Sequence, residues 1–199
     1  KLKVVGRAGV GVDNIDLEAA KAHHVTVVNS PLATTVAVAE LTLSLMLSLV
    51  REIPRADASM KSGKWLKKEF EGRELYGKTL GVLGFGRIGS AVAARAKAFE
   101  MKILAYDPVV SAEEIRARGG EPVSLDDLLK QSDMITMHMP LTSESKHLLN
   151  REAFSKMKDG VYIVCAARGG VIDEDALLEA LNSGKVAGAA LDVFATEPP

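Results

Sequence analysis

A glycine-rich turn constrains the fold of this chain more than any other feature. Gly84-Phe85-Gly86-Arg87-Ile88-Gly89 reads G-x-G-x-x-G, directly after the apolar run at 80–83 and at the start of the helical pattern at 88–99. In that setting Gly84 permits a tight turn, Gly86 lets the backbone approach a pyrophosphate, and Gly89 allows close packing of helix and strand. The sequence therefore predicts a dinucleotide-binding turn rather than an ordinary glycine-rich loop.

An acidic residue at the end of the next predicted strand supports this interpretation. Asp107 follows the glycines at roughly the 20-residue offset of a ribose-binding acid. Its carboxylate is expected to bind both adenosine ribose hydroxyls, and the amides of Arg87 and Ile88 are expected to meet the pyrophosphate at the helix N-terminus. Because the carboxylate repels a 2′-phosphate and Pro108 and Val109 offer no arginine, we expect NAD rather than NADP.

Short apolar runs alternate with helical patterns from residue 79 onward. The apolar runs are continuous, which is typical of strands buried on both faces, and they lie at 80–83, 103–106, 134–137, 161–164 and 187–191. The helical patterns lie at 88–99, 112–118, 125–130 and 174–183. This alternation predicts an α/β fold with a doubly wound parallel sheet of the Rossmann type.

The first third of the chain has a different pattern. We expect strands at 2–5 and 25–28, a loop containing Gly6, Gly9 and Gly11, and a helix at 17–23 with Asp16 as its N-cap. A long helix follows around 38–50, and Pro54 is expected to break or restart it, with a second helix at 55–62.

Composition excludes several classes of protein. With 25 Lys and Arg against 26 Asp and Glu, nothing basic is in excess to meet nucleic acid or an anionic membrane surface. The single Cys165 excludes a disulfide scaffold and a cysteine-built zinc site, and no metal site is expected. The longest apolar stretch, at 36–50, is too short and too polar for a span of about 20 apolar residues. A reduced, cytoplasmic setting is the expectation.

Four segments together resemble a known family. They are the glycine turn at 81–89 followed by Tyr106-Asp107-Pro108, the stretch 165–174, the stretch 188–194, and Glu197-Pro198-Pro199. These resemble the D-isomer-specific 2-hydroxyacid dehydrogenases, and the resemblance covers essentially the whole chain. The stretches 5–16 and 58–65 are most similar to the members that oxidise 3-phosphoglycerate, the first step of L-serine synthesis. The resemblance implies an NAD-dependent oxidoreductase.

The resemblance implies roles for two catalytic residues. Arg168 matches the arginine that holds the substrate carboxylate, a task that suits a planar guanidinium with two parallel donors. Glu197 matches the acid that polarises a histidine acting as general base. That histidine is expected beyond Pro199, and none of His23, His24, His138 and His147 replaces it. We therefore expect this chain alone to bind NAD(H) without measurable dehydrogenation.

The resemblance also implies binding residues. Asp192 matches a residue at the nicotinamide end of the cofactor, Pro140 and Thr142 match the loop beside the adenosine, and Cys165 and Ala166 lie near the nicotinamide ribose. The family's substrate loop corresponds to Arg7, Ala8, Gly9 and Val10. Val10 is also expected to contact the cofactor, and Arg168 is also expected to contact the substrate. Cys165 departs from the family, which usually has asparagine there.

Domain and subunit organisation follow from the resemblance. Residues 1–34 are expected to be the remnant of a second α/β, substrate-binding domain with its crossover, and residues 35–199 a Rossmann domain truncated at its C-terminal end. The helix at 38–50 is apolar nearly all round, which suits either a core helix or a subunit interface. Since the family's subunits meet here, we expect a homodimer, with higher oligomers possible in a longer protein.

Two groups of alternatives remain open. Within the family, reductases of glyoxylate or hydroxypyruvate and D-lactate dehydrogenases share the same motifs. From another functional class, related NAD-sensing corepressors keep the fold and many motifs without turnover. The stretches 5–16 and 58–65 favour the enzyme that acts on 3-phosphoglycerate.

Overall fold

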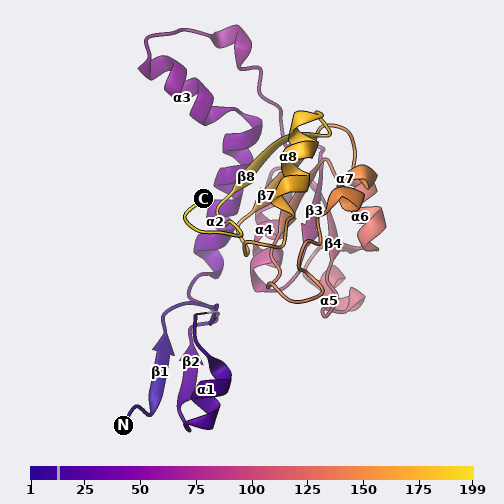
Figure 1. Cartoon of the computed structure of the whole chain (residues 1–199). Helices are drawn as coiled ribbons and strands as arrows, with labels where there is room; N and C mark the ends of the chain where they lie inside the picture. Colours follow the sequence, from indigo (N-terminus) through magenta and orange to yellow (C-terminus); the bar gives the residue numbers. More distant parts are fainter. Residues whose placement is uncertain (13) are drawn as a thin grey trace. The chain divides into compact units, whose positions relative to one another are not determined.

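The computed structural model describes residues 1–12 and 14–199, which form two compact units, Lys1–Val38 and Ala39–Pro199. Asp13, which belongs to the stretch 5–16, lies outside the described residues. Figure 1 shows the helices and strands of both units.

The larger unit is built on a six-stranded sheet in which all neighbours are parallel. The order is β5-β4-β3-β6-β7-β8. The strands are β3 (Thr79–Leu83), β4 (Lys102–Tyr106), β5 (Glu121–Pro122), β6 (Met134–Met137), β7 (Val161–Cys165) and β8 (Val186–Leu191). Successive strands run outward from β3 in one direction and from β6 in the other. This reversal opens a crevice beyond the carboxyl ends of β3 and β6, where ligands bind in open α/β sheets.

Helices cover both faces of this sheet. One buried cluster joins the sheet to α6 (Leu125–Gln131), α7 (Arg151–Lys156) and α8 (Glu174–Asn182). The other joins the opposite face to α2 (Thr35–Val50), α4 (Arg87–Ala98) and α5 (Ala112–Ala117). Strand residues alternate between the clusters, as when Val82 belongs to one and Leu83 to the other. The predicted doubly wound parallel fold is confirmed.

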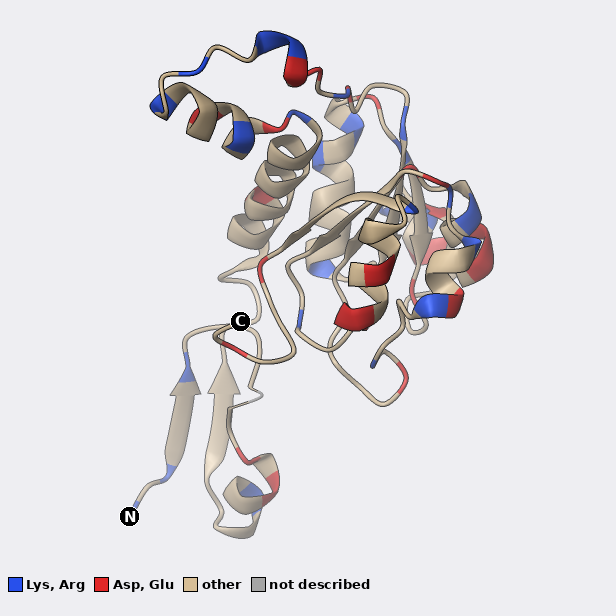
Figure 2. Ribbon diagram, turned by 45° about the horizontal axis from the view of Figure 1, so that its top comes forward, with Lys and Arg blue, Asp and Glu red and all other residues tan. Residues whose placement is uncertain are grey.

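The helix α2 packs one side against the core. Its buried residues are Ala39, Thr42, Leu43, Met46 and Val50, at the spacing of one helical face. It is followed by α3 (Ile53–Lys61), whose first turn contains Pro54, and by a short 3-10 turn η1 (Lys67–Glu69). The expected restart at Pro54 is confirmed, although α3 begins at Ile53. Figure 2 shows α2 almost without charge, and Figure 1 shows α3 extending beyond the end of α2.

The smaller unit contains the parallel strands β1 (Val4–Arg7) and β2 (Thr26–Asn29) and the helix α1 (Leu17–Ala22). Asp16 caps α1 as predicted, because its carboxylate accepts a hydrogen bond from the Ala19 N–H at 2.8 Å. The prediction for Gly6 is wrong: this residue lies within β1 and pairs with Val28. Since a glycine between Val5 and Arg7 can adopt extended backbone, its presence did not mark the start of the loop.

Two elements are absent from the sequence-based prediction. The strand β5 has only two residues and no apolar run, and it is defined by its pairing with Leu104 and Ala105 of β4. The helix α7 is six residues long, and Asn150 caps it by accepting from the Ala153 N–H at 3.0 Å. Asn150 is a helix-capping residue and was the sequence signal for α7. The strand β5 has no such signal, because its extended backbone depends on pairing with β4.

Candidate cofactor-binding site

The glycine turn lies against the ends of both strands that flank β3. The Gly84 N–H donates to the Tyr106 carbonyl at 2.8 Å, and the His138 N–H donates to the Leu83 carbonyl at 2.7 Å. Gly84 has φ +89°, and a Cβ there would lie 2.7 Å from the His138 backbone. Because a side chain is excluded both by φ and by space, only glycine suits this tight turn.

The other two glycines of the motif meet different surroundings. A Cβ at Gly89 would overlap the Gly84 carbonyl oxygen, so the helix and the turn pack together with no room for a side chain. A Cβ at Gly86 would meet nothing within 4 Å, which leaves the backbone open to an incoming group. The close packing predicted at Gly89 is present, and the open space at Gly86 is compatible with the predicted approach of a pyrophosphate, which stays a prediction.

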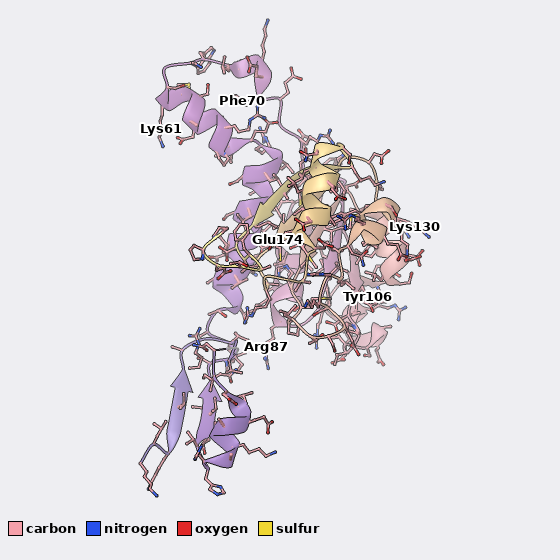
Figure 3. All side chains as sticks on the ribbon, in the orientation of Figure 1. Lys61, Phe70, Arg87, Tyr106, Lys130 and Glu174 are labelled. Carbon is pink, nitrogen blue, oxygen red and sulfur yellow. The ribbon has the colours of Figure 1, made fainter. Side chains whose placement is uncertain are left out.

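The first turn of α4 presents backbone donors toward this opening. Gly86 is the N-cap of the helix and offers no side-chain cap, and Arg87 and Ile88 are the first two helical residues. Unsatisfied N–H groups and the helix dipole favour an anion at this point. Figure 3 labels Arg87 at the start of α4 and Tyr106 at the end of the neighbouring strand β4.

Asp107 is held by backbone amides from two segments. Its Oδ2 accepts from the Phe85 N–H at 2.6 Å, and its Oδ1 accepts from the N–H groups of Val109 and Val110 at 2.8 and 3.0 Å. The carboxylate is thus oriented by the glycine turn and by the turn that follows β4. Two carboxylate oxygens offer about four acceptor sites, and three of them are used here, so one remains for a sugar hydroxyl.

A cavity of about 330 Å³ lies beside Asp107 at the switch point of the sheet. The predicted residues Gly84, Gly86, Asp107, Pro140 and Thr142 all line it. Sequence reasoning did not assign a binding role to several other lining residues, including His138, Val109 and Ser145. Small ligands are usually bound in mostly apolar clefts of this size with a few polar groups.

Ser145 fixes one wall of the cavity. Its buried hydroxyl donates to the Pro140 carbonyl at 2.6 Å and accepts from the Thr142 N–H at 2.8 Å. The Thr142 hydroxyl lies 3.2 Å from the same oxygen. Pro140 and Thr142 are therefore held in place by a serine five residues along the chain from the proline, and the T-x-x-S spacing was the signal for it.

His138 is a structural residue, as expected from the sequence. Its Nε2 lies 3.0 Å from the Thr136 hydroxyl, and its buried Nδ1 has no partner among residues 1–12 and 14–199. Burial lowers the pKa of His138 from 6.5 to about 4, because the ring cannot be solvated as a cation. The imidazole is therefore neutral at physiological pH.

The ends of β7 and β8 carry the other predicted residues. Cys165 pairs with Leu191, and the Asp192 N–H donates to the Cys165 carbonyl at 2.9 Å, so Cys165, Ala166 and Asp192 lie at one edge of the sheet. Burial raises the pKa of the Cys165 thiol, which keeps it protonated. This cysteine is a buried strand residue, consistent with the interpretation from the sequence.

The loop of Arg168 and the loop of Glu197 pack against each other. A Cβ at Gly169 would overlap the Phe194 carbonyl oxygen and approach the Ala195 nitrogen. The Arg168 guanidinium donates to the Ala167 carbonyl at 2.7 Å, and Glu197 accepts from the Phe194 N–H at 3.0 Å. Glu174, at the start of α8, accepts from the Ala195 N–H at 2.6 Å, a contact that sequence reasoning missed.

The predicted substrate loop lies in the smaller unit. Arg7 ends β1 and donates to the Ala8 carbonyl at 3.2 Å, and the Gly9 N–H donates to the Arg7 carbonyl at 2.9 Å. The Val10 carbonyl accepts from the Asn29 side chain at 2.7 Å. These contacts hold the four residues as one turn between the ends of β1 and β2.

No group of three or more His, Cys, Asp or Glu side chains among the described residues is arranged to hold a metal ion. No described helix has both the length and the apolar character needed to cross a bilayer.

Comparison with known proteins gives consistent matches. The family model of the D-isomer specific 2-hydroxyacid dehydrogenase, NAD binding domain, matches residues 43–199. The D-3-phosphoglycerate dehydrogenase of Methanocaldococcus jannaschii is 56% identical over 100% of this chain and 38% of its own length. The hydroxypyruvate reductase of Thermotoga maritima is 54% identical over 100% of this chain and 64% of its own length.

Solved structures show the same similarity. The D-lactate dehydrogenase of Aquifex aeolicus, in complex with NAD and lactic acid, has a TM-score of 0.87 and 44% identity, covering 97% of this chain and 58% of that one. The chain thus spans less than two thirds of the length of each of these relatives.

Proposed function

The chain belongs to the D-isomer specific 2-hydroxyacid dehydrogenases, and on that premise we propose that it serves the oxidation of 3-phosphoglycerate to 3-phosphohydroxypyruvate. NAD is the cofactor of the family's matching domain. Support for the substrate comes from the 56% identity to a relative named D-3-phosphoglycerate dehydrogenase. This reaction would place the protein at the entry to L-serine synthesis.

The crevice at the carboxyl ends of β3, β4 and β6 is the observation that carries the proposal. In it we assign the ribose hydroxyls to Asp107 and the diphosphate to the amides of Gly86, Arg87 and Ile88, with the adenosine beside Pro140 and Thr142. Gly89 keeps the helix close enough for these amides to reach. The open backbone at Gly86 and the mostly apolar cavity beside an oriented carboxylate fit this ligand.

The nicotinamide half is assigned to the neighbouring strand ends. Cys165 and Ala166 at the end of β7 and Asp192 after β8 would lie along it, and Val10 is proposed as a further contact. NAD, when bound, supplies the acceptor for the hydride that leaves C2 of the substrate. The preference for NAD over NADP follows from Asp107, because a fixed carboxylate repels a 2′-phosphate.

Substrate orientation is assigned to Arg168 and to the turn of Arg7, Ala8, Gly9 and Val10. A guanidinium binds a carboxylate through two parallel hydrogen bonds, which fixes C2 relative to the cofactor. Glu197 is proposed to orient a histidine that takes the hydroxyl proton. The pKa of about 4 makes His138 a poor base at neutral pH. The other histidines, His23, His24 and His147, are exposed, so we expect no turnover by this chain alone.

Reduction of hydroxypyruvate is the second candidate. It is supported by the 54% identity to a hydroxypyruvate reductase of which this chain covers 64%. Both reactions would use the same carboxylate clamp and move a hydride between C2 and the nicotinamide, in opposite directions. Their substrates differ in the group bound beyond C2.

We further propose the domain and subunit organisation expected from the sequence. Residues 1–34 would belong to a substrate-binding domain and residues 35–199 to the NAD-binding domain. A homodimer is proposed through α2 and the segment after it, where Met60 and Trp65 are 55% and 75% exposed. Large exposed apolar side chains often mark a partner surface. A cytoplasmic setting is proposed as well, in keeping with the single buried, unpaired Cys165.

The test combines binding with turnover. Calorimetry of the chain with NADH and NADPH is expected to show binding of NADH and much weaker binding of NADPH. A longer protein that carries this chain is then assayed for NADH formation with 3-phosphoglycerate and D-lactate, and for NADH consumption with hydroxypyruvate. Fastest turnover of 3-phosphoglycerate supports the proposal. Preference for either other substrate overturns the substrate assignment, and failure to bind NADH overturns the site.

A further inference from the structure

An arginine outside the crevice contacts the glycine turn from behind. Arg118 follows α5, and its Nη1 donates to the Phe85 carbonyl oxygen at 2.9 Å. Its Nη2 donates to Glu114 at 3.2 Å, and the Glu114 carboxylate also receives the Ser111 N–H at 3.3 Å as part of the capping box of α5. The guanidinium is therefore held at one end by its own helix and bonded at the other to the turn.

The Phe85 carbonyl controls the direction of a donor in the proposed phosphate site. The carbonyl of Phe85 and the N–H of Gly86 belong to one trans peptide plane, so they point in opposite directions. The Gly86 N–H has no acceptor among the residues that the structure describes. Glycine backbone rotates more freely than that of other residues, so a bond to the oxygen limits how this plane can turn.

The segment that follows α5 also contacts the Phe85 side chain. The ring is fully buried, and a Cβ at Gly120 would lie 2.7 Å from its Cζ atom. The Phe85 N–H is bonded to Asp107 at 2.6 Å. Phe85 is thus held at its ring, its N–H and its carbonyl, and Arg118 provides the one side-chain donor in this set.

We infer that Arg118 is a positioning residue that holds the Phe85–Gly86 peptide with its N–H directed toward the diphosphate of the dinucleotide. This inference rests on the proposed function, since it presumes that the cofactor lies on the glycine turn. Arg118 acts through the backbone and does not touch the ligand. Its contribution is preorganisation: the donor is already aimed before binding, so less is lost in ordering the turn.

The test compares three variants of the chain. Arg118→Met removes the bond, Arg118→Lys restores one donor of the same charge, and Arg116→Met removes an equal charge from the same helix, where no side-chain bond to the turn exists. Calorimetry with NADH and ADP-ribose gives the affinities. The ¹⁵N–¹H chemical shift of Gly86 in the ligand-free chain reports the peptide orientation, and thermal unfolding reports the stability.

Arg118→Met is expected to weaken both ligands about tenfold, the scale of one hydrogen bond to a charged group. It should also shift the Gly86 amide signal. Arg118→Lys should recover part of both effects, and Arg116→Met should change neither. Equal loss in the two methionine variants would show a general charge effect and overturn the inference, as would an unchanged Gly86 signal in Arg118→Met.

Failure of the inference is distinguishable from failure of the proposed function. If the unaltered chain does not bind NADH, the site assignment fails, whatever the variants do. If it binds NADH and Arg118→Met binds equally well, only the role of Arg118 fails. Should Arg118→Met not fold, Arg118→Gln takes its place, because a shorter, uncharged side chain also removes the guanidinium bond to Phe85: a shifted Gly86 signal supports the inference, and an unchanged signal overturns it.

Discussion

Two halves of one sheet edge hold their acidic residues in different ways. On the β3–β4 side, the Asp107 carboxylate accepts from Phe85, 22 residues earlier in the chain, and from the turn that follows it. On the β7–β8 side, the exposed Glu197 accepts from Phe194, three residues away. The first carboxylate is positioned by the fold, whereas the second is positioned by its own loop.

This difference suits the two proposed roles, which are cofactor binding for Asp107 and orientation of a histidine for Glu197. An acid held by distant backbone groups is oriented before any ligand arrives, and this preorganisation suits a binding role. An acid held locally can exchange its partner when a histidine approaches, which suits the proposed role of Glu197. The predictions below test whether the two halves differ in this way.

The largest expected effect is on stability in acid. His138 directly follows β6 and Cys165 ends the neighbouring β7, and burial keeps both side chains neutral: it lowers the pKa of His138 to about 4 and raises that of Cys165. The unfolded chain protonates the histidine below its ordinary pKa of 6.5, while the folded chain does not until about 4. Stability is therefore full above pH 6.5 and falls between 6.5 and 4, by up to about 3 kcal/mol.

Denaturant unfolding of the chain at a series of pH values measures this loss. His138→Gln should flatten the profile in that window, and the exposed His147→Asn should leave it unchanged. Since the thiol titrates on the alkaline side, Cys165→Ala should not alter the acid limb. If His138→Gln still loses stability between pH 6.5 and 4, groups other than His138 cause that loss.

The next effect concerns the glycines. Gly89→Ala and Gly169→Ala each place a Cβ against a backbone carbonyl, one in each half, so each should cost about 2 to 3 kcal/mol of unfolding free energy. Gly86→Ala meets open space and should unfold like the unaltered chain, yet bind NADH more weakly because its methyl group occupies the approach. Denaturation and calorimetry measure the two quantities. Normal stability in Gly89→Ala would show that the turn is less tightly packed.

The contrast between the two acids is tested directly by cofactor binding. Asp107→Ala removes the carboxylate from the proposed ribose site and should weaken NADH binding about 10- to 100-fold, or ~1.5–3 kcal/mol. Glu197→Ala, the matched change in the other half, should leave NADH affinity unaltered. Unchanged affinity in Asp107→Ala would refute the ribose assignment, and a comparable loss in Glu197→Ala would remove the distinction between the halves.

The smallest effect is expected at Ser145. Ser145→Ala leaves the Pro140 carbonyl and the Thr142 N–H without their partner, so NADH affinity should fall about fivefold, near 1 kcal/mol. Ser155→Ala is the control, because that hydroxyl is bonded to Glu152 within α7, away from the cavity. A larger loss in the control than in Ser145→Ala would contradict the assignment of this wall.

The sequence was sufficient for most of the fold because strands buried on both faces leave continuous apolar runs. The run at 134–137 coincides with β6, and those of β3, β4, β7 and β8 differ by one residue at an end. The strand β5 was not predictable, since Glu121 and Pro122 carry no apolar signal and are extended only through pairing with β4. Gly6 shows the opposite error: because it is a glycine it was assigned to the loop, although its backbone pairs with Val28 within the small sheet.

The candidate site likewise contains features that could be predicted from the sequence and contacts that could not. The glycine spacing and the offset of Asp107 reflect the geometry of one strand–turn–helix–strand segment, so they could be predicted from the sequence. The bonds of Arg118 to Phe85 and of Glu174 to Ala195 join residues far apart in sequence, and neither side chain belongs to a spacing rule. Such contacts become visible only when the sheet brings the segments together.

The parallel sheet also decides where the molecule tolerates additions. All six strands start from one edge, so the connections returning to that edge carry none of the crevice residues. Gly184, in the return before β8, has φ +78° and open space around it. A reporter group or a grafted peptide inserted there is expected to leave the proposed nucleotide crevice intact, so this edge is a suitable point of attachment for sensors built on the domain.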